Sequence, residues 1–451
     1  MACQRGLPRR PSPPPPSLAR PQGNPTPVQY SIPQPIRPHG VPVTDDCPRI
    51  RPLDIIPVQS QGRQAFLLRD PQGISPHQLV VPADIAYLLS QLDGTRTVRE
   101  VQVSYVRRFG ALLTTDRIGE ILQRLDEALL LDTERFREFR RAVEAEFRAR
   151  PTRAAAHAGR SYEAAAAAFA RSWQPRLEAA GQPAGFRLDS NRPAFIAPHY
   201  DMDGAAECYA SAYALLAAVE RPDVVVILGI AHSGQAPFAL TRKPFETPFG
   251  ALDTDPEIID RLARDAPLDL FADEFAHRDE HSIEFQAVLL HHVYREQSDP
   301  PVIVPILCGG YHRLGDGASD PRGMEHINRF LDLLRDVLAA DSRRLAVIAS
   351  ADLSHIGTRF GGPPINQVHL DLARRHDLAL LERAQAGDAD GLYRVFAEAG
   401  DRYNVCGFPA IYALLRALPL SQGRLLSYRQ AVEAQTHSCV SFASVALRPG
   451  P

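Results

Sequence analysis

Three apolar, β-branched segments in the C-terminal two thirds of the sequence each end in a polar turn. They span Ala194–His199, Val224–His232 and Leu345–His355. Short apolar runs separated by helical patterns are typical of buried strands in an α/β sheet, and such sheets bind ligands beyond the carboxyl ends of their parallel strands. We therefore expect a polar site at these ends. Its candidate residues are His199, His232, Asp352 and His355.

The length of the chain limits how it is organised. A sequence of 451 residues exceeds one ordinary domain, and its 45% hydrophobic content is enough for a sizeable core. Residues 1–45 combine the Pro13–Pro16 run with Ser, Gln, Gly and Arg, a composition that buries too little apolar surface to fold. We therefore expect a disordered Pro-rich tail followed by two folded units.

The first folded unit is predicted to span residues 48–132. Ala65–Leu68 and Gln78–Val81 have the pattern of two short strands, joined by the turn-forming Asp70–Ile74 stretch. Three helices are predicted to follow. They cover Pro82–Leu92, a segment opened by the Thr97 and Glu100 capping box, and a segment from Thr115 to about Leu130. This order predicts a small winged-helix-like α+β domain.

Two stretches of this unit, 92–98 and 121–131, resemble the small PqqD-like domains that grip leader peptides. The resemblance implies a peptide partner. DNA binding is the usual role of a winged helix, but the predicted third helix has more acidic than basic residues, which disfavours phosphate contacts. Residues 133–153 then form a predicted helical connector, with Phe136, Phe139 and Phe147 on one stripe.

Residues 154–449 are predicted to form the larger domain. Strand patterns at 195–198, 224–229, 302–307 and 345–350 alternate with helical patterns, which predicts a mostly parallel sheet with helices on both faces. Arg424–Tyr428 and Val440–Leu447 read as two strands joined without a helix, and we expect them at an antiparallel margin of that sheet.

Charge and composition exclude several partners. A formal net charge of -3 gives no single-sign field to attract nucleic acid or an anionic membrane, so we expect neither. Residues 1–20 lack an apolar signal core, and no stretch approaches the roughly 20 apolar residues of a membrane helix. We expect a cytoplasmic protein. The six cysteines are widely scattered, which predicts reduced thiols rather than a disulfide framework.

Two histidines at neighbouring strand ends suggest a metal site. His199 follows Pro198, which ends a strand, and His232 lies in a Gly-Ile-Ala-His-Ser-Gly turn after the next one. An open metal site needs about three protein ligands. Asp352 would complete a two-histidine, one-carboxylate iron site, whereas Cys406 would make a softer site for copper, zinc or iron. The structural alternatives are a helix cap for Asp352 and a buried small apolar residue for Cys406.

A further polar cluster, Arg278–Glu284, opens a predicted helix. His281 and Glu284 are three residues apart and can share one face of that helix. A capping role explains part of the pattern. The functional interpretation is that the pair relays a proton or orients the metal ligands.

Together these motifs resemble the Memo family, known in bacteria as component B of the AmmeMemoRadiSam system. The likeness covers residues 155–448. Its motifs are Ile196–His199, Ile227–His232, Thr247–Gly250, Asp279–Glu284, Pro305–Leu307, Ser350–His355, Cys406–Gly407 and Val440–Ala443.

The resemblance implies a fold similar to class III extradiol dioxygenases and one transition-metal ion, iron or copper or else zinc, held by His199, His232 and Cys406. Asp352, His355 and His281 would be the catalytic residues lining the same pocket, with His355 as acid/base. A redox-active, dioxygenase-like protein acting on a small molecule or peptide is the first hypothesis. The alternatives are a non-catalytic adaptor that partners a radical SAM enzyme, and a zinc-dependent hydrolase.

The chain departs from the usual family pattern at two places. The first histidine continues as Tyr200-Asp201-Met202-Asp203, so two extra carboxylates follow it and either is able to bind metal or close the pocket. The second motif has Ser233 where relatives commonly carry another histidine, which removes one imidazole from the site.

Overall fold

The structure is a computed structural model that describes residues 47–449, apart from 61, 182–187, 189–191, 298 and 312–319. The predicted tail, residues 1–45, lies outside the described residues.

The first folded unit contains a three-stranded antiparallel sheet in the order β1-β2-β3. Its strands are β1 (Asp54–Ser60), β2 (Arg63–Arg69) and β3 (Leu79–Pro82). The predicted hairpin corresponds to β2 and β3, but the sequence analysis missed β1. Pro57 argues against a central strand, and β1 is an edge strand, where proline is tolerated.

Three helices complete this unit: α1 (Ala83–Ser90), α2 (Val98–Phe109) and α3 (Thr115–Glu127). The predicted capping box forms, because the Thr97 hydroxyl accepts from the Glu100 N–H while Glu100 accepts from the Thr97 N–H. Leu88, Ile118 and Leu122 contribute to a core of its own. The long helix α4 (Glu134–Ala149) follows at the predicted connector.

The larger domain is built on an eight-stranded mixed sheet, as predicted for an α/β fold. Its path is β11-β13-β4-β10-β5-β9-β6, and β12 also pairs with β13. The four parallel strands are β4 (Ala194–Ala197), β5 (Val224–Ile230), β9 (Val302–Cys308) and β10 (Leu345–Ser350). The antiparallel strands are β6 (Phe238–Leu240), β11 (Asp352–Gly357), β12 (Leu420–Glu433) and β13 (Ser438–Pro449). The expected antiparallel margin is therefore confirmed.

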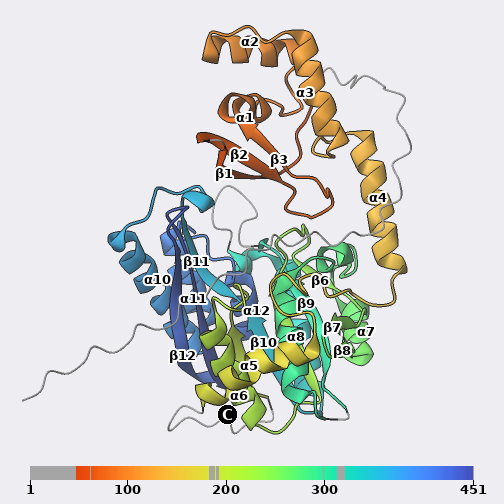
Figure 1. Cartoon of the computed structure of the whole chain (residues 1–451). Helices are drawn as coiled ribbons and strands as arrows, with labels where there is room; N and C mark the ends of the chain where they lie inside the picture. The colour runs from red at the N-terminus through yellow and green to blue at the C-terminus, as the bar shows by residue number, and fades with distance from the viewer. Residues whose placement is uncertain are drawn as a thin grey trace, which may run out of the picture. The chain divides into compact units, whose positions relative to one another are not determined.

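Alternating side chains of the strands enter two cores, one on each face of the sheet. Phe195 and Ile227 pack with helices α5 (Ala166–Ala180), α6 (Ala206–Ala218) and α8 (His281–Tyr294), which lie in front of the sheet in Figure 1. Ile196 and Val226 enter the other core. Its helices are α7 (Pro256–Asp265), α9 (Glu325–Ala340), α10 (Gln367–Gln385), α11 (Ala389–Ala399) and α12 (Phe408–Ala417).

Smaller elements fill the remaining connections. They are the hairpin β7 (Phe245–Thr247) and β8 (Gly250–Leu252) and the 3₁₀ turns η1 (Glu274–His277), η3 (Pro321–Gly323) and η4 (Thr358–Phe360). Within the described part of the chain, no helix is both long and apolar enough to cross a bilayer.

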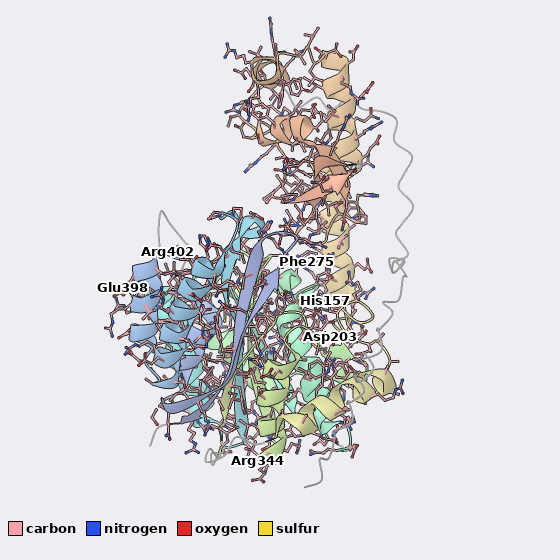
Figure 2. All side chains as sticks on the ribbon, turned by 60° about the vertical axis from the view of Figure 1, so that its left-hand side comes forward. His157, Asp203, Phe275, Arg344, Glu398 and Arg402 are labelled. Carbon is pink, nitrogen blue, oxygen red and sulfur yellow. The ribbon has the colours of Figure 1, made fainter. Side chains whose placement is uncertain are left out.

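The predicted strand at 345–350 is confirmed as β10, but the predicted polar turn after it forms a further strand. β10 ends at Ser350, and the chain then enters β11, which pairs antiparallel with β13. Asp352, the first residue of β11, therefore lies just past the carboxyl end of β10, and His355 lies three residues further along β11. In Figure 2, Arg344, which precedes β10, is labelled at the bottom, and Asp203, which follows β4, is labelled above it. The parallel strands therefore run upward in this view.

A buried carboxylate on α10 ties together β11, β12 and β13. Asp377 accepts hydrogen bonds from Ser354 (2.5 Å), Ser441 (2.5 Å) and Tyr428 (2.8 Å), and it is fully buried. Burial raises the pKa of Asp377 to about 6 despite these donors. Because Ser354 precedes His355, this cluster also fixes the strand that carries His355.

The raised pKa of Asp377 predicts a pH-dependent stability. The folded chain holds this proton up to about pH 6, whereas the unfolded carboxyl loses it near pH 3.9, so the favourable contribution is complete at low pH and disappears as pH rises. Between pH 4 and pH 7 the free energy of unfolding of the wild type should fall by about 2 kcal/mol relative to that of Asp377→Asn. Urea unfolding of both proteins across this range measures the difference. A difference that is independent of pH would contradict the assignment.

Candidate metal centre

His199 lies two residues beyond β4, and its side chain is buried. The ring Nδ1 is 3.0 Å from the Ser350 carbonyl oxygen at the end of the neighbouring strand β10. A carbonyl only accepts, so Nδ1 must donate its hydrogen there. The hydrogen bond therefore fixes the ring with Nε2 directed away from Ser350, and in the neutral ring Nε2 carries the lone pair.

His232 is held in the same way after β5. Its Nδ1 is 3.0 and 3.1 Å from the two carboxylate oxygens of Glu280, and its backbone N–H also donates to Glu280. Desolvation alone would lower the pKa of His232, but the Glu280 carboxylate and the Cys406 thiol raise it well above its usual value. The carboxylate thus fixes Nδ1 and leaves Nε2 for the centre of the site.

Cys406 reaches the same point from the turn before α12. Its Sγ is 3.3 Å from His199 Nε2, and donor atoms of His199, His232 and Cys406 all lie within 4.8 Å of one another. Gly407 allows this approach, because a Cβ there would lie 2.2 Å from the Asp352 carbonyl oxygen. Burial would raise the pKa of the Cys406 thiol, but His199 and His232 lower it below its ordinary value.

These three residues fit a transition-metal ion. Ligand distances of about 2.3 Å for sulfur and 2.0 Å for nitrogen place two tetrahedral donors about 3.5 Å apart, close to the observed 3.3 Å between Cys406 Sγ and His199 Nε2. Both imidazoles have Nδ1 on an oxygen acceptor, which is the usual support of a metal-bound histidine. The thiolate supplies negative charge that a cation compensates.

Asp352, the competing third ligand, lies beside His199. Its carboxylate accepts from the backbone N–H groups of His199 (3.0 Å) and Tyr200 (3.2 Å), and its other oxygen is 3.6 Å from His199 Nε2. Burial raises the pKa of Asp352 to about 6. The geometry groups Cys406, rather than Asp352, with the two histidines.

His355 and His281 have different surroundings. His355 Nδ1 is 3.0 Å from the Leu353 carbonyl, its ring stands edge-on to Phe360, and this histidine acts to lower the pKa of Asp352. The His281 ring stacks on His232 with centroids 4.9 Å apart and is 5.4 Å from the His199 ring. Burial lowers the pKa of His281 well below its usual value, so this imidazole is neutral.

His281 and Glu284, three residues apart at the start of α8, have different partners. Glu284 is fully buried and forms an ion pair with Arg153, and it also accepts from Tyr162 and from the His157 backbone N–H. The partner of His281 is instead Glu280, whose Oε1 is 3.3 Å from His281 Nδ1. Glu280 also caps α8 by accepting from the Ser282 N–H. The sequence held one signal for this contact: Glu280 is an acidic residue directly before a predicted helix and next to His281.

The two extra carboxylates after His199 have other partners. Asp201 accepts from the Gly204 N–H at 2.9 Å, closing the turn before α6. Asp203 is exposed and forms an ion pair with Arg176 at 2.8 Å. Neither belongs to a group of residues positioned to bind metal within the described ranges.

Glu280 provides a direct test of how His232 is supported. Glu280→Gln keeps the size of the side chain but removes the charge that attracts the Nδ1 hydrogen of His232. We expect metal affinity to fall by about 10- to 100-fold, the usual cost of losing such a partner. Competition with a chromophoric chelator measures it, and Glu274→Gln, which alters an acid on η1, is the control. Equal affinities for both variants would refute this role.

Comparisons with known proteins show the family of this chain. The family model described as "Memo-like protein" matches residues 153–446. A "MEMO1 family protein" of Aquifex aeolicus is 28% identical over 88% of this chain and 99% of its own length. A relative from Thermus thermophilus is 29% identical over 78% of this chain and 99% of its length, and one from Methanopyrus kandleri is 30% identical over 57% and 84%.

A mixed α/β domain with a His-His-Cys group at its strand ends is thus the architecture of this chain. The chain belongs to the Memo family. The alignment with the Aquifex protein extends beyond residues 153–446, so the relative shares part of the sequence before the Memo-like region.

Proposed function

We propose that this protein is a metal-dependent redox protein whose single iron or copper ion is held by His199, His232 and Cys406. The observation that carries the proposal is the shared orientation of the two imidazoles. Each has Nδ1 on an oxygen acceptor, which leaves both Nε2 atoms for the ion beside Cys406. Iron or copper with imidazole and thiolate ligands would supply one-electron chemistry.

The surrounding residues support proton transfer beside such an ion. With a pKa of about 6, Asp352 exchanges a proton near neutral pH while its backbone hydrogen bonds fix the turn after β4. His355 lies close enough to Asp352 to influence that pKa. We assign His355 the acid/base role, by likeness to the extradiol dioxygenases. His281 remains neutral and orients the His232 ring by stacking.

Metal analysis of protein purified without oxygen and without chelator tests this proposal. We expect close to one equivalent of iron or copper, with an electron paramagnetic resonance signal that changes reversibly when air and dithionite are added in turn. One equivalent of zinc, with no redox response and no oxygen consumption, would contradict a redox role and favour a zinc-dependent hydrolase.

A second candidate function, peptide binding by the small domain, is favoured by a groove between β3 and α3. The groove has a volume of about 550 Å³. β3 is an edge strand with no second neighbour in the described part of the chain, so an extended peptide can add to it. Val80 and Ile121 offer apolar contacts. Arg117, which also pairs with Glu120, and Arg124 outnumber Glu127 in the lining, which favours an acidic peptide. This would make the protein an adaptor, for example for a peptide handled by a radical SAM enzyme.

Charge reversal in this groove tests the adaptor function. We expect the full chain to bind members of an acidic peptide library, and the double variant Arg117→Glu, Arg124→Glu to lose them because the attraction becomes repulsion. Arg107→Glu, Arg108→Glu on α2 is the matched control, since neither residue lines the groove. Fluorescence anisotropy measures binding. Equal loss in both double variants would refute a specific groove.

A further inference from the structure

A second group of donor atoms lies directly beside the proposed metal centre. His232, Glu280 and His281 place ligand atoms within 4.8 Å of one another. Glu280 Oε2 is 3.0 Å from His232 Nδ1, and Oε1 is 3.3 Å from His281 Nδ1. Because Nδ1 of His232 faces Glu280, an ion of the first group would bind Nε2, and the two groups would take opposite nitrogens of one ring.

The separations within this second group suit a divalent ion. Oxygen and nitrogen ligands at about 2.1 Å, with bond angles between 90° and 110°, lie about 3.0 to 3.4 Å apart. The Glu280 carboxylate is 3% exposed, whereas the side chains of His232 and His281 are 38% and 31% exposed. Glu280 is thus the buried member of the group, and the two histidines are partly exposed to solvent.

Two imidazoles and one carboxylate form a harder donor set than two imidazoles and one thiolate. Carboxylate sites favour ions such as Mn²⁺, whereas thiolates favour softer ions. A neutral imidazole has one lone pair, so His232 can bind an ion through Nε2 or through Nδ1 but not through both. The two positions are therefore alternatives for one ion.

We propose that His232, Glu280 and His281 form a second metal position that takes a hard divalent ion such as Mn²⁺, in competition with the softer ion at Cys406. His232 is common to both positions. The type of ion therefore decides which position is occupied. An ion that binds at Glu280 displaces the ion at Cys406, and the protein still binds one equivalent in total.

Two spectroscopic probes separate the positions. Cobalt(II) at the first position gives a thiolate-to-metal charge-transfer absorption band. Manganese(II) that binds at the second position loses the electron paramagnetic resonance signal of the free ion. Cys406→Ser should abolish the cobalt–thiolate band while changing the Mn²⁺ dissociation constant by about twofold or less. His281→Ala should weaken Mn²⁺ by about 10-fold or more and keep the cobalt–thiolate band.

Three further measurements complete the test. His232→Ala should lose both ions, and Mn²⁺ should displace cobalt from the wild type with one equivalent bound in total. Cys439→Ser and His291→Ala, which lie outside both groups, are the controls. Equal weakening of Mn²⁺ and cobalt by Cys406→Ser, or unchanged Mn²⁺ binding in His281→Ala, would overturn the second position. Absence of a cobalt–thiolate band in the wild type would instead contradict the proposed function.

Discussion

His199→Ala and His232→Ala should each reduce the bound metal from about one equivalent to about a tenth of an equivalent or less after dialysis. Each removes one of the three proposed protein ligands of the iron or copper ion, and the two ligands that remain should hold such an ion much more weakly. The two residues come from different strand ends, so equal losses would show that both ends contribute to one site. Elemental analysis by plasma mass spectrometry measures the content.

The controls for this experiment lie within the same domain. His291→Ala changes an imidazole on α8 that bonds Thr247 and belongs to neither donor group. It should retain full metal content. Circular dichroism of each variant confirms that the fold is intact. Unchanged metal content in folded His199→Ala and His232→Ala proteins would rule out both residues as ligands.

Arg153→Ala should lower the free energy of unfolding by about 3 to 5 kcal/mol, the cost of leaving one partner of a buried ion pair alone. Arg153 and Glu284 both have side chains that are 0% exposed and contact each other directly. The guanidinium also donates to the carbonyl oxygens of His277 and Glu280, so its removal takes one buried donor from each of these acceptors. The lost contacts lie at the start of α8, so the structural disturbance should be largest there, at Glu280 and His281.

A surface ion pair gives the matched comparison. Arg69 and Asp54 are 2.6 Å apart, but their side chains are 45% and 38% exposed. Arg69→Ala should therefore cost only about 0 to 1 kcal/mol. Chemical unfolding of the two variants measures both values. Similar losses for Arg153→Ala and Arg69→Ala would contradict the structural role given to the buried pair.

Much of the larger domain could be predicted from the sequence because its strands are buried on both faces. Val224–Ile230 is apolar at every position, and its alternate side chains enter opposite cores, which is what a central parallel strand requires. The strand-end histidines followed from this pattern. β1 and the separate strand β11 were not predicted, because Pro57 argued against the first and the polar residues between Ser350 and His355 were read as a turn.

It was harder to predict from the sequence which residues make up the site. His199 and Cys406 are separated by 207 positions, and their contact depends on Gly407 packing against the Asp352 carbonyl. No local pattern encodes that approach, so the residues alone left Asp352 and Cys406 as competing ligands. Glu280 was missed as the support of His232, because an acid before a helix also reads as a simple cap.

X-ray absorption of the protein loaded with one equivalent of zinc tests the central claim most directly, since it counts the ligand atoms around the ion. Two imidazoles and a thiolate predict one sulfur at about 2.3 Å and nitrogen or oxygen neighbours at about 2.0 Å. Cys406→Ser should remove the sulfur shell alone. A wild-type spectrum with only nitrogen and oxygen neighbours would contradict the joint binding of one ion by His199, His232 and Cys406.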